Sequence, residues 1–179
     1  MLVAHEEHLN IKSLPTLESL GSHYPRRRKG SNAMPILNYT TKIDADKSAS
    51  EIAKCLSLHG AKAVMTEYDA KESYVTSLSF KMSLGGNEIG FRLPCDWKPV
   101  LVILENDRKV PRSMVTREQA VKVAWRIVKD WVEAQMALVE TKMVTTQEVF
   151  LPYAIMRNGK TLAQSVAENP KFLLGDGNK

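Results

Sequence analysis

The sequence predicts an α+β fold: a small antiparallel sheet of about four strands, with one short and one long amphipathic helix packed on one face and a helical C-terminal part. Two observations carry this prediction. Apolar and polar residues alternate over 78–84, stop at a Gly-Gly-Asn turn, and alternate again over 89–93, as in a β-hairpin. Two capping boxes, at 48–51 and 116–119, each open a stretch with apolar residues at helical spacing.

The other two strands are predicted from residue type. β-Branched and aromatic residues over 37–43 predict a first strand that ends at Asp44, and the stretch 61–68 suits a second one. The resulting element order is β-α-β-β-β-α-α. We find no internal repeat and no linker long enough to divide this part of the chain.

The helices are bounded by their capping residues. The box at 48–51 predicts a helix over 49–59, stopped by Gly60, and the box at 116–119 predicts a long helix over 117–142. The apolar run 99–104 is ambiguous between strand and helix, but Pro99 near its start favours a helix. Thr145 or Thr146 is expected to cap another turn or two before Pro152, and 161–167 is predicted to be a last short helix.

Residues 1–33 differ from the rest of the 179-residue chain, so we predict an appendage followed by a single α+β domain over 34–179. The appendage holds three of the four histidines and the basic run 26–29, without a periodic pattern. We predict that it is disordered or not native, with Met34 as the true start. Two alternatives remain: a cloning scar at 31–33, or a genuine basic arm that binds phosphate or a partner.

Composition excludes several classes of protein. No stretch approaches the roughly eighteen consecutive apolar residues of a membrane-spanning helix, and the first thirty residues lack the apolar core of a secretory signal. We therefore expect a cytoplasmic protein without a membrane partner. Cys55 and Cys95 have neither a disulfide-framework nor a metal-ligand spacing, so both are expected to be reduced and buried.

No motif predicts an enzyme. Within 34–179 the only histidine is His59, which lies on an apolar stripe and is expected to be a core or helix-end residue. Cys95 is expected to pack at a strand end. Lys129 and Glu133 have the spacing of an ordinary surface ion pair on a helix, so the neighbouring carboxylates do not indicate a catalytic pair. We expect no catalytic residue, no metal site and no cofactor.

The feature that points to a function is a local excess of positive charge. Residues 34–179 hold 20 Lys+Arg and 17 Asp+Glu, yet the stretch 108–129 has seven cations against Glu118 alone, a local charge of +6. On a helix with 3.6 residues per turn, Lys122, Arg126 and Lys129 form a ladder, predicted to lie opposite the apolar stripe. The predicted site is the whole set: Arg108, Lys109, Arg112, Arg117, Lys122, Arg126 and Lys129.

Seven cations on one surface predict binding to a polyanion, because neutralised phosphates release counterions. The expected partner is nucleic acid, DNA or RNA, held by its backbone because no aromatic residue interleaves the ladder. An acidic protein surface, or a solvated face without any ligand, is the alternative. Trp125 and Trp131 fall on the apolar face, as core residues or as a stripe that pairs two copies into a homodimer.

Three segments carry a resemblance: 38–44 (NYTTKID), 124–135 (AWRIVKDWVEAQ) and 148–153 (EVFLPY). They resemble a family of small proteins encoded on prophages, plasmids and conjugative elements of Gram-positive bacteria, over about 35–175. The resemblance implies an accessory protein of a mobile element that handles nucleic acid or disarms host defence, for instance an anti-CRISPR-like inhibitor of an RNA-guided nuclease. The rival expectation is a homodimeric structural or interaction protein that binds no nucleic acid.

Overall fold

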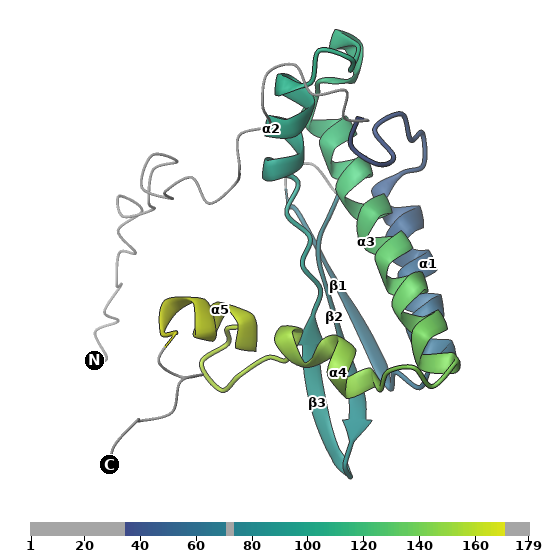
Figure 1. The fold of residues 1–179 in the computed structure, drawn as a ribbon, viewed down its shortest axis with the longest axis vertical. Coiled ribbons are helices and arrows are strands. Elements are labelled where there is room, and N and C mark those ends of the chain that lie inside the picture. Colours follow the sequence, from purple (N-terminus) through teal and green to yellow (C-terminus); the bar gives the residue numbers. More distant parts are fainter. Residues whose placement is uncertain (1–34, 71–73, 171–179) are drawn as a thin grey trace, which may run out of the picture. The chain divides into compact units, whose positions relative to one another are not determined.

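The computed structural model describes residues 35–70 and 74–170, all within one compact unit, Pro35–Lys179. The interpretations of segment 1–33 lie outside these residues. Three antiparallel strands form a sheet in the order β1-β2-β3, with β1 over Ala63–Tyr68, β2 over Val75–Leu84 and β3 over Asn87–Arg92 (Figure 1). The α+β class and the predicted hairpin are confirmed.

The β2–β3 hairpin has the register that its alternation predicts. Phe80 is paired with Phe91 and Met82 with Ile89, so the apolar side chains of both strands share one face. The turn is closed by Gly85 and Gly86 at φ values of 57° and 82°, in the left-handed region that glycine adopts without a Cβ penalty.

The described part of the chain also forms five α-helices. They are α1 (Ala45–Leu58), α2 (Lys98–Asn106), α3 (Arg117–Glu140), α4 (Thr146–Phe150) and α5 (Leu162–Glu168). Short 3-10 segments lie at Arg112–Met114 and Leu151–Tyr153. The run 99–104 is helical, as Pro99 indicated, and Thr145 caps α4 in a complete capping box. In Figure 1, α1 and α3 run side by side along the sheet.

The predicted first strand, 37–43, is wrong. Residues 37–40 form a turn, with Asn38 at φ 62°. The Gln119 side-chain amide donates to the carbonyls of Tyr39 and Thr41 at 2.8 and 2.9 Å, bonds that bind this segment to α3. Ile36 and Tyr39 pack beside the buried residues of α2 and α3. Tertiary contacts with α3 therefore override the local preference for a strand.

A partial fourth pairing forms elsewhere. The backbone N–H of Ile155 donates to the Gly90 carbonyl at 2.8 Å, and Ala154 forms an isolated bridge with Phe91. A stretch just after the 3-10 segment 151–153 thus covers the outer edge of β3. No alternation of residues marks this pairing in advance, because a stretch of two residues is too short to show a period.

The predicted start of the first helix is also wrong, by one turn. Asp44 is the N-cap and the helix runs from Ala45, so the proposed cap, Ser48, lies inside α1 and is fully buried. Small buried residues at 45, 48 and 49 let α1 approach its neighbours closely, which favours an additional helical turn. The C-terminal prediction is confirmed: Gly60 follows the helix at φ 92°.

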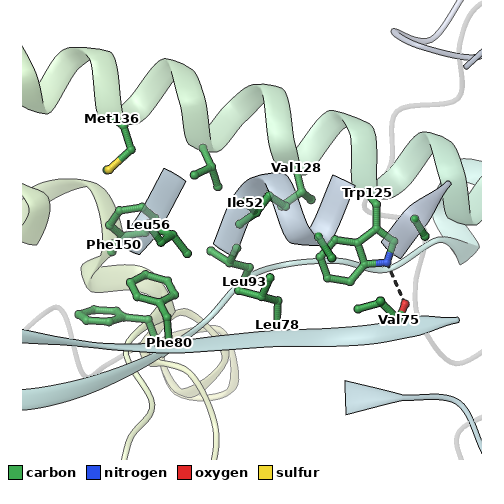
Figure 2. Close-up of a cluster of buried hydrophobic side chains, with 14 of the residues drawn as sticks. Ile52, Leu56, Val75, Leu78, Phe80, Leu93, Trp125, Val128, Met136 and Phe150 are labelled. Atoms are coloured by element: carbon green, nitrogen blue, oxygen red, sulfur yellow. Dashed lines mark hydrogen bonds between the residues drawn. The ribbon is translucent and has the colours of Figure 1, made fainter. Parts of the chain in front are cut away.

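The main core lies between the sheet and the helices (Figure 2). Trp125 of α3 is 1% exposed and its indole N–H donates to the Val75 carbonyl at 2.8 Å. Phe150 lies within 5.2 Å of the Phe80 ring and 6.1 Å of the Phe91 ring, measured between centroids. A second cluster packs α2 against the first half of α3. Helix α3 therefore has packed elements on several sides, and these elements determine how exposed its cations are.

Candidate functional site

The predicted basic surface is divided by the fold into three environments: a ladder on α3, an arginine clamp at its N-terminus, and a loop that precedes it. In the ladder, the side chains of Lys122, Arg126 and Lys129 are only 21%, 18% and 11% exposed. The prediction that this ladder faces solvent, opposite the apolar stripe, is wrong. Helix α1 runs parallel to α3 and covers that side of it.

Lys122 bridges the N-terminal ends of the two helices. Its Nζ lies 2.8 Å from Glu118 Oε1, one turn earlier on α3, and 3.0 Å from Asp44 Oδ1, the N-cap of α1. Hydrogen bonds from Glu118 and then from Asp44 raise the pKa of Lys122 above its ordinary value. The ammonium group therefore stays charged, and it is held by this chain's own carboxylates.

Arg126 and Lys129 continue the same seam between α1 and α3. Arg126 Nη1 donates to Glu51 Oε2 of α1 at 2.7 Å, and Lys129 Nζ donates to Glu133 Oε2 at 2.5 Å. Asp130 lies 3.7 Å from Arg126 Nε and 3.6 Å from Lys129 Nζ, measured from its Oδ1. Three cations thus meet five carboxylates along the seam, so its formal charge is negative and it does not attract a polyanion.

The i,i+4 pairs of this seam were visible in the sequence, but the interhelical pairs were not. Lys122 with Glu118, and Lys129 with Glu133, have the spacing of helix neighbours. In the chain, Asp44 is far from Lys122 and Glu51 is 75 positions from Arg126. Only the parallel docking of α1 on α3 brings these pairs together. The ladder on α3 is basic in sequence, but its cations are ion-paired in the folded protein.

Arg117 forms the second environment. Its guanidinium carbon lies 5.1 Å from the Tyr74 ring centroid and 4.8 Å from that of Trp97, and its Nη2 donates to the Tyr74 hydroxyl. Stacking between two aromatic rings fixes a guanidinium through cation–π attraction. Arg117 therefore joins the start of β2 to the start of α3, and we assign it a structural role.

The third environment is the basic loop, residues 107–116, which carries Arg108, Lys109 and Arg112, all exposed. Val110, 5% exposed, anchors the loop in the second cluster. Asp107 shapes its start, because its Oδ1 accepts from the Lys109 backbone N–H at 3.0 Å. Neither Arg108 nor Arg112 makes an ion pair with any residue of 35–70 or 74–170. These two arginines are the predicted site residues that remain available.

The tryptophan stripe does not form a dimer surface. Trp125 is a core residue, and the Trp131 ring contacts Phe150 and Tyr153 edge-on, with centroids 5.8 and 5.4 Å apart. Helix α4 and the segment after it cover the place where a second copy was expected to pack. Of the two alternatives expected for this stripe, core or dimer contact, the structure gives both tryptophans intramolecular contacts.

Cys55, His59 and Glu140 are aligned at the C-terminal end of the seam, in the order of a nucleophile, a base and an acid. His59 Nδ1 is 3.9 Å from Cys55 Sγ, and its Nε2 is 2.9 Å from Glu140 Oε1. However, the same Nδ1 lies 2.7 Å from the Cys55 carbonyl, to which it donates its proton. Burial, then Glu133 and Glu140, raise the pKa of the Cys55 thiol, so the thiolate is disfavoured. The arrangement ties α1 to α3 and does not activate a nucleophile.

Cys55 and Cys95 are free thiols of intermediate exposure, so the expectation that both are buried is met only in part. Cys95 offers a test of how far its thiol is shielded from solvent. Burial, with a smaller effect from Asp96, raises the pKa of this thiol to about 12. At pH 8 we expect Cys95 in the folded protein to react with a thiol reagent at least tenfold more slowly than after unfolding. Mass spectrometry of partly labelled protein identifies the modified residue, and Cys95→Ser is the control. Equal labelling of Cys95 in the folded and unfolded chain would contradict this shielding of its thiol.

A hollow of about 420 Å³ opens between the N-termini of α1 and α3. Its polar lining consists of Asp44, Asp46, Tyr74, Arg117, Glu118 and Lys122. No histidine, cysteine or serine is among these lining residues. Among the described residues no group of three histidines, cysteines or carboxylates is placed to hold a metal ion, and no helix is long and apolar enough to cross a membrane.

The chain was compared with protein-family models, with curated proteins and with solved structures, and none of them matches it.

Proposed function

We propose that this chain is a non-enzymatic protein that binds nucleic acid, or a complex that handles nucleic acid, through the basic loop 107–116. The observation that carries the proposal is the exposure of Arg108 and Arg112 without a carboxylate partner in the described part of the chain. A guanidinium presents donors in a planar fork that matches phosphate oxygens. Both groups are on a short loop whose backbone is anchored by Val110.

The loop suits the nucleic-acid backbone better than the bases. It contains no aromatic residue on which a base could stack. Contacts to phosphate alone give sequence-independent, salt-sensitive affinity. With two or three such contacts the site is small, so binding is expected to be weak at physiological salt.

The proposed setting is the cytoplasm of a bacterium that carries a mobile element, as the family resemblance implies. More specifically, we propose that the protein inhibits a host defence nuclease, either by occupying a nucleic-acid channel or by binding the nuclease. This specific form rests on the resemblance and not on the geometry of the loop.

The test removes the two available cations. Arg108→Ala with Arg112→Ala is expected to weaken binding to a fluorescent duplex at least tenfold, and to reduce the slope of log K against log salt by about two, since each phosphate contact contributes about 0.9. Fluorescence anisotropy at several salt concentrations measures both quantities. Any contribution of the basic run 26–29 is the same in both proteins.

The matched control is Lys54→Ala with Lys81→Ala, which removes the same charge from exposed positions on α1 and β2. It is expected to bind as the parent does. Equal affinity of the loop variant and the parent, or no binding by the parent at any salt concentration, would contradict the proposal.

A further inference from the structure

The face of the sheet that points away from the main core carries short polar side chains along its central strand, β2. Phe80 belongs to the core, so Ser77 and Ser79, which are one and three positions before it, point to this outer face. The strand register places Ser79 between two long side chains, Met65 of β1 and Arg92 of β3. In this position Ser79 is only 7% exposed. A row of three side chains therefore crosses the sheet, with the shortest in the middle.

Three polar atoms on this outer face are buried and have no hydrogen-bond partner: Ser77 Oγ, Ser79 Oγ and Arg92 Nε. Ser79 and Arg92 are direct cross-strand neighbours, and the Cβ atoms of such a pair are about 5 Å apart. Ser77 precedes Ser79 on the same face, about 7 Å away along the strand. Buried polar groups of native proteins are nearly always hydrogen-bonded, so three such groups in one place indicate a partner from outside the chain.

The charge of Arg92 favours an anion over a water molecule as this partner. Arg92 Nη1 donates to the Gly159 carbonyl over a long distance, 3.3 Å, and the guanidinium makes no ion pair with any carboxylate of 35–70 or 74–170. Glu67 lies across from Ser77 on the same face, but it is exposed and does not contact the guanidinium. A partly buried cation without a counter-ion is unfavourable, and an anion that accepts from Nε removes this cost.

We propose that Ser77, Ser79 and Arg92 bind the phosphate group of a phosphate monoester. The two hydroxyls and the Nε–H supply three donors, and a monoester presents three terminal oxygens with nearly two negative charges at neutral pH. A phosphodiester of the nucleic-acid backbone has only two such oxygens and one charge, so it fits this donor set less well. Met65 and Arg92 have stems with several rotatable bonds, so changes of rotamer expose the hydroxyls to the ligand. This site is separate from the basic loop, and the inference is independent of nucleic-acid binding.

Inorganic phosphate is the probe, titrated into the ¹⁵N-labelled full chain at about pH 7.5, where it is mostly a dianion, with sodium chloride holding the ionic strength constant. The amide NMR signals of residues 77–79 and 92 are expected to shift and to saturate with a Kd of about 1–10 mM. Phosphate bound elsewhere on the chain leaves these signals in place. Arg92→Gln is expected to weaken binding at least tenfold, because it removes the charge, and Ser79→Ala at least threefold, because it removes one donor.

The control for charge alone is Lys54→Gln, on an exposed position of α1, which is expected to leave phosphate affinity unchanged. Far-UV circular dichroism confirms that each variant is folded, and Ser79→Ala decides if Arg92→Gln is not. A parent without saturating shifts at 77–79 and 92, or shifts that Arg92→Gln retains, overturns the inference, because water then satisfies the three atoms. A loss of duplex affinity in Arg92→Gln as large as its loss of phosphate affinity overturns the assignment to a monoester.

Discussion

Trp125→Ala is expected to lower the free energy of unfolding by about 3–5 kcal/mol, a large part of the total stability of a domain of this size. The indole is 1% exposed and packs between α3 and the sheet, so its removal leaves a cavity that neighbouring side chains fill only in part. It also leaves the Val75 carbonyl without its hydrogen bond from the indole, as Figure 2 shows. Urea denaturation followed by circular dichroism measures the change.

Two matched variants separate packing from hydrogen bonding. Trp125→Phe keeps an aromatic ring and is expected to cost roughly half as much as Trp125→Ala, through lost volume and the unpaired Val75 carbonyl. Trp131→Phe keeps the edge-on contacts with Phe150 and Tyr153 and is expected to cost about 1 kcal/mol or less. If Trp125→Ala and Trp131→Phe had the same small effect, Trp125 would not be the centre of the core.

Replacement of Lys122, Arg126 and Lys129 together by alanine is expected to lower the free energy of unfolding by about 2–4 kcal/mol. The three stems are largely buried between α1 and α3, so alanine removes their packing. It also leaves five carboxylates along the seam without their cations, and these then repel one another. The expected loss stays in this range because most of the carboxylates are substantially exposed and screened by water.

The control is the triple variant Lys42→Ala, Lys47→Ala and Lys54→Ala, which removes the same charge from exposed positions. Its free energy of unfolding is expected to change by about 0.5 kcal/mol or less per site. A ladder variant as stable as this control would show that the seam contributes nothing to stability.

The ladder variant also separates stability from binding. Where it remains folded, it is expected to bind a duplex with nearly the affinity of the parent, because its cations are already occupied by carboxylates. The loop variant, Arg108→Ala with Arg112→Ala, is expected to show the reverse: unchanged stability and weakened binding. If the folded ladder variant lost binding, the binding site would include the cations of α3.

The elements that the sequence determined by itself are those specified by short-range rules. The β2–β3 hairpin follows from alternation with period two around two glycines, and α3 follows from its cap at Thr116 and its apolar stripe. In both, the residues that make the element are neighbours in the chain. The helical state of 99–104 was likewise indicated by a local feature, Pro99.

Only the tertiary structure decided the rest, because the deciding partners are far apart in the chain. Residues 37–43 have strand-forming side chains, yet Gln119 holds them in a turn from 78 and 80 positions away. The cations of α3 look like a surface in sequence, since a helical projection shows which residues share a side but not what covers that side. The docking of α1 supplies Asp44 and Glu51, which convert the expected binding ladder into an ion-paired seam. The exposed cations of the predicted site are then Arg108, Lys109 and Arg112, all on the loop.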